Sequence, residues 1–192
     1  MRKVSILLVA LLALTVGASV AFAGSLPGTK TAHDRAVWRS ILSWPNGCEQ
    51  SWRLTQAIGA GVYLESAGAS GQLVTVSCYL GAYQGDAMLY LVNPSNKAIG
   101  PLVLQIYRDP GNGHPRLTRQ TEILGIIGFA HATGTLAVFD EFRGLGDCGI
   151  YSRYRLDGSH FLLIEARAKT ACNGKPPFAP QSWPKLPIPK GG

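Results

Sequence analysis

The segment Gly149–Lys169 reads GIYSRYRLDGSHFLLIEARAK. Two alternating runs flank Asp157-Gly158-Ser159, which predicts two antiparallel strands joined by a three-residue hairpin loop. A two-residue loop would shift the register by one residue and mix apolar with polar side chains on each face. On the outward face, Arg153 is expected to lie diagonal to Glu165. The predicted inward face is mostly apolar and consists of Ile150, Ser152, Tyr154, Leu156, His160, Leu162, Ile164 and Ala166.

Further strands are predicted on the N-terminal side of this hairpin. Short runs rich in Val, Leu, Ile and Tyr alternate there with Gly, Ser and Asn, which is typical of antiparallel sheets. The predicted strands are Gly61–Ser66, Gln72–Leu80, Ala87–Val92, Pro101–Arg108, Arg116–Ile127 and Thr133–Phe139.

Upstream of these strands, the helical spacing of apolar residues predicts one short amphipathic helix over Thr31–Trp44. Thr31 is the expected N-cap, and Pro45 is expected to end the helix. The fold class is therefore mainly β with a minor α component. We expect an antiparallel sheet, a sandwich or barrel-like, with one short N-terminal helix.

The first 23 residues have the pattern of a secretory signal peptide. Arg2 and Lys3 precede an uncharged apolar stretch, and Ala21-Phe22-Ala23 supplies the small residues that signal peptidase needs. The alternative is an uncleaved membrane anchor, because no charge follows until Lys30. We expect cleavage before Gly24, which leaves no stable membrane span. The chain then comprises a signal peptide (1–23), a single disulfide-bonded β-rich domain (24–172) and a Pro-rich tail (173–192).

Composition and charge narrow the classes of partner. Hydrophobic residues make up 46% of the chain and charged residues 15%, a balance that fills a core. Of the 18 basic residues, 16 remain after the loss of Arg2 and Lys3, against 11 acidic residues, a net charge of +5. The positive electrostatic field of this net charge favours an anionic envelope ligand or a protein partner, although solubility alone also accounts for the charge. Nucleic acid is not expected, because no basic-aromatic binding motif is present.

The four cysteines lie at positions 48, 78, 148 and 172, all beyond the predicted cleavage point. In an exported chain, four cysteines most simply form two disulfides, and three pairings are possible. We favour Cys48–Cys78 with Cys148–Cys172, because each pair brackets a compact local unit. The alternative, that Cys148 is a nucleophile, is disfavoured by its neighbour Asp147, which would raise the thiol pKa.

The segment Gly144–Gly149 (GLGDCG) opens a longer pattern that continues with Tyr154, the Asp157-Gly158 turn, the FLL and EAR triplets after it, and Cys172. This pattern resembles the C-terminal signature of a bacterial extracytoplasmic family, domain of unknown function 1176. Tyr154 stands where tryptophan is expected, a conservative change for an inward aromatic residue. The rest of the chain aligns only in outline. The resemblance implies an exported, periplasmic, disulfide-bearing protein and supports the Cys148–Cys172 pairing, but it implies no activity and no catalytic residues.

No metal or cofactor is expected from the sequence. There is no Cys-x-x-Cys pair, and the histidines are far apart without the spacing of metal ligands. These histidines are His33, His114, His131 and His160.

A hydrolase is one alternative function. The residue types of a serine hydrolase are present, but no Gly-x-Ser-x-Gly elbow accompanies them. Adjacent acids such as Asp140-Glu141 point to opposite faces of a strand and do not form the carboxylate pair of a glycosidase. The candidate residues are Ser152, His131 or His160, and Asp140 or Asp147.

The leading hypothesis is a periplasmic or secreted protein without enzymatic activity that binds a ligand or another protein. Arg153, Arg155 and Arg167 project from the outward face of the predicted hairpin, where they can form a cationic patch for carboxylate or phosphate groups. An ordinary solvated sheet face is the favoured alternative to this patch. A third possibility is a structural envelope component that uses the Pro-rich tail for assembly. The tail is expected to be a plain extended segment, and docking of Trp183 on a partner or on the domain is the alternative.

Overall fold

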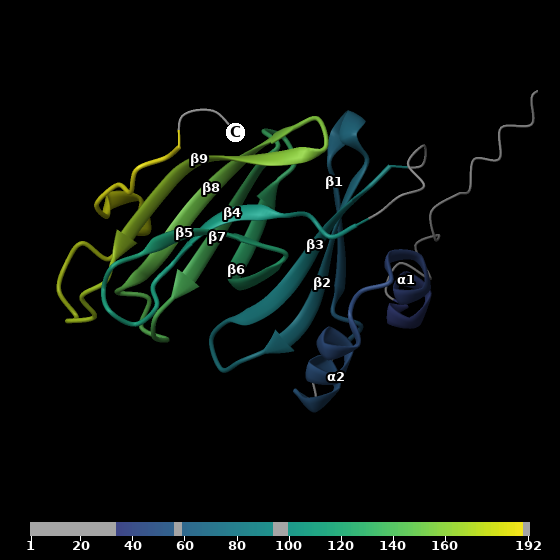
Figure 1. The fold of residues 1–192 in the computed structure, drawn as a ribbon, viewed down its shortest axis with the longest axis horizontal. Coiled ribbons are helices and arrows are strands. Elements are labelled where there is room, and N and C mark those ends of the chain that lie inside the picture. The colour runs from purple at the N-terminus through teal and green to yellow at the C-terminus, as the bar shows by residue number, and fades with distance from the viewer. Residues whose placement is uncertain (1–33, 56–58, 94–99, 190–192) are drawn as a thin grey trace, which may run out of the picture.

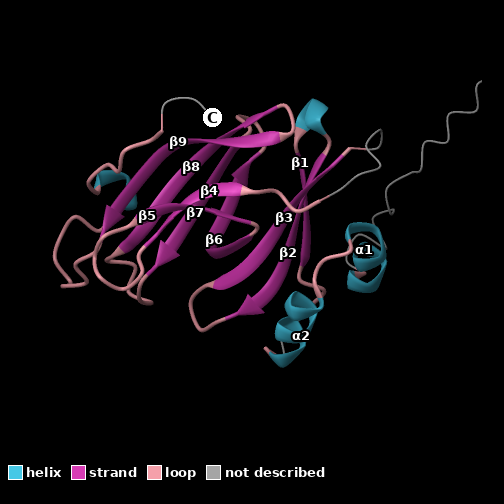
Figure 2. Cartoon of the chain, in the orientation of Figure 1, coloured by secondary structure: helices cyan, strands magenta, loops and turns pink. Residues whose placement is uncertain are grey.

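The computed structural model describes residues 34–55, 59–93 and 100–189. Within them the chain forms two α-helices, nine strands and two short 3-10 turns (Figures 1 and 2). The predicted signal peptide, residues 1–23, lies outside the described residues. The helices are α1 (Arg35–Leu42) and α2 (Asn46–Leu54). The strands are β1 (Val62–Ser66), β2 (Gln72–Leu80), β3 (Gly85–Val92), β4 (Leu104–Arg108), β5 (Arg116–Gln120), β6 (Glu122–Ala130), β7 (Thr135–Glu141), β8 (Gly149–Asp157) and β9 (His160–Lys169).

The N-terminal part contains two helices, so the prediction of one helix was wrong. The Asp34 side chain caps α1 by accepting bonds from the Ala36 and Val37 amides. Ser43 then adopts the left-handed conformation, with φ of 51°, and ends α1. Pro45 directly precedes α2, because its fixed φ suits the start of a helix as well as the end of one. Thr31, the predicted N-cap, lies outside the described residues.

The fold class is confirmed as mainly β. Seven antiparallel strands form one open, curved sheet in the order β1-β2-β3-β6-β7-β8-β9, and β4 pairs with β5 in a second sheet. The helices lie beside β1–β3, at the opposite end from β9 (Figure 1). The predicted single strand Arg116–Ile127 was wrong, because a bend at Thr121 divides it into β5 and β6, which pair in different sheets.

Each face of the sheet packs in part against a different partner. Over β1–β3, one face packs on the helices through Trp38, Val74 and Val76. The other face is concave, and β4 lies across it over β8 and β9. There the Tyr154 hydroxyl donates to the Gln105 carbonyl over 3.0 Å. The core on the concave side includes Leu73, Leu89, Leu104, Ile106, Ile123, Leu136, Val138, Ile150, Tyr154, Phe161 and Leu163.

Strand β6 belongs to both halves of the large sheet. Its first part pairs with β3, where Gly125 faces Gly85, and its second part pairs with β7, where Ile126 faces Phe139. Gly125 has a φ of +133°, and a Cβ there would lie 2.6 Å from the Phe139 carbonyl oxygen. Only glycine allows this close approach of two backbones, so the change of pairing partner from β3 to β7 depends on Gly125.

Replacing Gly125 with alanine is expected to lower the free energy of unfolding by about 1–3 kcal/mol, because the new Cβ must move the β7 backbone. Urea unfolding followed by far-UV circular dichroism measures this change. Gly128→Ala, three residues along β6, is the control, since nothing lies within 4 Å of its Cβ position. Equal stability of the two variants would contradict this account of Gly125.

The β8–β9 hairpin has a different register from the predicted one. Asp157 pairs with His160, so the loop has two residues, and a bulge lies between the Arg153–Glu165 and Tyr154–Leu163 pairs. The bulge leaves Ile164 as an extra residue, which lets apolar side chains on both sides of it face inward. Phe161 and Leu163 are therefore buried in place of the predicted His160, Leu162 and Ile164. Arg153 lies directly opposite Glu165, where a diagonal position was expected.

The Pro-rich tail is bound to the domain, so the plain-tail interpretation was wrong. Trp183 is 1% exposed, and its ring packs edge-on against Phe139, with centroids 5.6 Å apart. The tail also bonds to β9: the Ala168 amide donates to the Pro184 carbonyl over 3.0 Å, and the Leu186 amide to the Ala166 carbonyl over 2.8 Å. The tail thus covers the edge of the sheet at β9, where unpaired backbone groups would otherwise be exposed.

Candidate functional site

An open hollow lies on the concave face, beyond the part that β4 fills. It is a groove of about 530 Å³, a size typical of small-ligand sites. Strand register explains it, because paired residues share a face: Tyr63 with Thr75, and Ser77 with Ala87. Its lining residues are Tyr63, Leu64, Glu65, Thr75, Ser77, Tyr79, Leu80, Gly85, Asp86, Ala87, Gly125 and Ile127.

Two hydroxyl-bearing residues form the floor of this groove. Thr75 is 9% exposed and Ser77 is 7% exposed. Neither hydroxyl has a hydrogen-bond partner among the described residues, and neither oxygen is among the fully enclosed atoms without partners. The two hydroxyls therefore reach solvent only through the groove. Both hydroxyls are thus available for hydrogen bonds from outside the chain.

Two tyrosines form part of the rim. Tyr63 is 52% exposed and Tyr79 is 45% exposed, far more than core aromatic residues. The floor between them stays low because the facing residues on β3 and β6 are Gly85, Ala87 and Gly125. The groove therefore combines a polar floor with exposed aromatic rings.

The charged residues of the groove are acidic. Burial raises the pKa of Glu65, an effect that His131 opposes. Burial also raises the pKa of Asp86, opposed by Arg108 and reinforced by Asp140. Among the described lining residues there is no Lys or Arg. The groove thus has the opposite charge from the chain as a whole.

The predicted cationic patch is only partly available. Glu165 binds Arg153 at 3.1 Å and Arg167 at 2.6 Å, and Arg167 also donates to the Trp183 carbonyl over 2.8 Å. Arg155 is exposed on β8, and no ion pair to it occurs within the described part of the chain. Arg153 and Arg167 therefore share the single negative charge of Glu165, Arg155 has no acidic partner among the described residues, and anion binding at this patch stays a prediction.

The residue types of a hydrolase are not brought together. Ser152 is buried in the core, five residues along β8 from the turn where His160 lies exposed. Asp140 pairs with Arg108 at 2.7 Å, and Asp147 pairs with Arg143 at 2.7 Å. None of these carboxylates orients a histidine in the described structure, as serine catalysis requires.

The two acids of the groove are also too far apart to act as a glycosidase pair. Glu65 is aligned through Leu73 with Leu91, five residues from Asp86 on β3. Five residues of strand span about 17 Å, well beyond the 5–10 Å that such chemistry uses.

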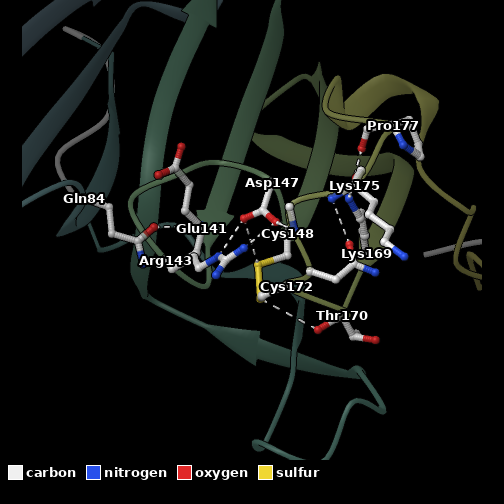
Figure 3. Close-up of a disulfide and its surroundings, with 12 residues drawn as sticks. Gln84, Glu141, Arg143, Asp147, Cys148, Lys169, Thr170, Cys172, Lys175 and Pro177 are labelled. Atoms are coloured by element: carbon white, nitrogen blue, oxygen red, sulfur yellow. Dashed lines mark hydrogen bonds and ion pairs between the residues drawn. A yellow bond between two sulfur atoms is a disulfide. The ribbon is translucent and has the colours of Figure 1, made fainter.

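The structure joins Cys48 to Cys78 and Cys148 to Cys172, the pairing favoured from the sequence. The first bond pins α2 to β2, and the second ties the loop before β8 to the start of the tail. Beside it, Asp147 binds Arg143 through two bonds of 2.7 Å and accepts the Gly174 amide over 2.7 Å (Figure 3). These contacts hold the pKa of Asp147 far below its usual range, with the Arg143 bonds as the largest cause. The GLGDCG segment therefore has a structural role.

Sequence reasoning missed the groove residues. The available signal was the alternation in β2, where Thr75, Ser77 and Tyr79 alternate with Val74, Val76 and Cys78. That pattern predicts a polar face, and a polar face usually means solvent. Only the curvature of the sheet shows that Thr75 and Ser77 are buried beneath a rim.

Fold and site together define a class: an open antiparallel sheet protein stabilised by two disulfides, with a ligand-sized groove on its concave face. Within that class, the chain belongs to the family described as "Protein of unknown function (DUF1176)", whose model matches residues 43–189. The resemblance seen in GLGDCG and the hairpin after it is thereby confirmed. The family description supplies no activity.

Two further comparisons add detail. The chain is 29% identical over 114 residues to the uncharacterized protein YpfG of Escherichia coli strain K12. The match covers 59% of this chain and 31% of YpfG, so the chain spans about a third of the length of that relative. No solved structure matches the chain. Among the described residues, no helix is long and apolar enough to cross a membrane.

Proposed function

We propose that this protein is exported and binds a small organic ligand in the groove between β1, β2, β3 and β6, without catalysing a reaction. Export is supported by the signal-peptide pattern of residues 1–23 and by two disulfides, which persist in oxidising compartments. One observation carries the binding role: on the floor of the groove, the hydroxyls of Thr75 and Ser77 have no hydrogen-bond partner among the described residues.

The stability effect of these hydroxyls distinguishes binding from a structural role. A hydroxyl that serves the fold stabilises it through its hydrogen bond, whereas a hydroxyl kept for a ligand adds no stability to the free protein. Thr118 on β5 is the matched control, because its hydroxyl donates to the Ile106 carbonyl over 3.1 Å.

In the oxidised protein expressed from its full chain, Thr75→Val/Ser77→Ala is expected to leave the melting temperature unchanged or to raise it. Thr118→Val is expected to lower it, by the loss of about 1 kcal/mol of hydrogen bonding. Differential scanning calorimetry compares the two. A double variant that loses at least as much stability as Thr118→Val would show that Thr75 and Ser77 serve the fold and would contradict the proposal.

A further inference from the structure

The chemistry of the groove limits what it can bind, and this inference rests on the proposed function. The lining has no described cation although the whole chain carries a net charge of +7. A phosphate, sulfate or carboxylate ligand needs a guanidinium, an ammonium or a cluster of backbone amides. The groove instead offers the carboxylates of Glu65 and Asp86, which repel anions. Anionic ligands are therefore disfavoured in this groove.

A purely apolar ligand does not fit the floor. It would cover Thr75 and Ser77 and leave both hydroxyls without any hydrogen-bond partner, which costs about 1–3 kcal/mol for each. A hydroxyl both donates and accepts, so its best partner is another hydroxyl or an amide. The ligand must therefore carry neutral polar groups that point at the floor.

An amine is disfavoured by the positions of the acids. Glu65 and Asp86 lie near opposite ends of the groove, about 17 Å apart along β3 by register, so they cannot converge on one ammonium group. Each carboxylate instead has free lone pairs that accept hydrogen bonds from hydroxyl groups. Neutral hydroxyl groups distributed along the ligand match this arrangement better than one positive charge.

The rim adds a preference for flat, partly apolar rings. Tyr63 and Tyr79 expose about half of their surface at the groove. There an aromatic face can cover C–H groups of a ligand while the phenol hydroxyl stays in contact with water. Thr75 and Ser77 lie two residues apart on one strand, about 7 Å, a spacing that suits hydroxyls at the two ends of one sugar ring. A sugar ring has an apolar C–H face and a rim of hydroxyls, and so matches both features.

We propose that the groove binds a neutral saccharide, with a ring stacked on Tyr63 and ring hydroxyls bonded to Thr75, Ser77 and Glu65. Heteronuclear NMR of the oxidised full-chain protein tests this with four probes. Maltotriose and chitotriose are neutral, trigalacturonate is anionic and spermidine is cationic. A neutral probe at millimolar concentration is expected to shift the backbone amides of β1 and β2 that line the groove.

Three variants identify the site. Tyr63→Ala is expected to weaken saccharide binding by about tenfold or more through the loss of stacking, whereas Tyr63→Phe keeps the ring and stays within about threefold. Tyr83→Ala is the matched control, because Tyr83 is 46% exposed but does not line the groove. Glu65→Gln keeps a hydrogen-bond acceptor and is expected to weaken saccharide binding only modestly, whereas it would remove most binding of an amine.

The outcomes separate the two proposals. Groove shifts caused by spermidine or trigalacturonate alone would overturn the saccharide assignment and leave the ligand-binding role standing. Saccharide shifts confined to other surfaces, or a saccharide affinity unaffected by Tyr63→Ala, would also overturn the assignment. If none of the four probes shifts the groove amides, the saccharide assignment is overturned. The calorimetry of Thr75→Val/Ser77→Ala would then decide the ligand-binding role by itself.

Discussion

Cys148→Ala/Cys172→Ala is expected to lower the free energy of unfolding by about 3–4 kcal/mol. The bond closes a loop with a sequence separation of 24, and in the chain-entropy model a loop of this size restricts the unfolded chain by about that amount. The loop contains β8 and β9, the hairpin that contributes Tyr154, Phe161 and Leu163 to the core. Since a domain of this size is stable by only about 5–15 kcal/mol, the loss is a large fraction of the total.

Urea unfolding of the double variant and of the oxidised parent measures this difference. Asp147 keeps its bonds to Arg143 and Gly174 in the variant, so the folded loop is expected to retain its conformation. Cys48→Ala/Cys78→Ala is the comparison, because its loop has a similar separation of 30 but pins only α2 to the sheet. A double variant within about 1 kcal/mol of the parent, or reactive thiols in the exported parent, would contradict the assigned role of the bond.

Strand bounds were predictable from the sequence where the local residue pattern alone determines them. Gln72–Leu80 was predicted with the bounds of β2, because apolar alternation and flanking Gly residues agree there. The hairpin around Gly158 was also predictable. Its register was not. The two-residue loop turns the odd residues Phe161 and Leu163 inward, and the bulge at Ile164 returns the inward positions to the even residues Ala166 and Ala168. No local rule places a bulge.

The helices and the groove depend on tertiary contacts that no local pattern reveals. In α2, NGCEQSWRL is too polar to suggest a helix, yet Glu49 binds Arg35 at 2.7 Å and Cys48 bonds to Cys78, and both contacts join distant segments. The groove similarly requires the change of pairing partner at Gly125 and the placement of β4. The residue types of the groove were visible in the sequence, but their common enclosure was not.

The largest stability loss is expected from Trp183→Ala, about 3–5 kcal/mol, the usual cost of removing a fully buried large aromatic side chain. The ring packs on Phe139, its indole N–H donates to the Pro177 carbonyl over 3.0 Å, and its own carbonyl accepts from Arg167. Loss of the ring removes the apolar anchor and leaves the edge bonds of the tail to β9 without support. The free edge of β9 then becomes available for pairing with a second chain.

Hydrogen exchange distinguishes this mechanism from a general loss of stability. The amides of Ala168 and Leu186, which bond to the Pro184 and Ala166 carbonyls, are expected to lose protection before the amides of β2. Phe178→Ala is the matched control, because Phe178 lies in the same tail but is 53% exposed, and its loss is expected to cost less than about 1 kcal/mol. If Trp183→Ala instead matches Phe178→Ala in urea unfolding, with both edge amides still protected, then the tail is held by its backbone and disulfide, and Trp183 is not its anchor.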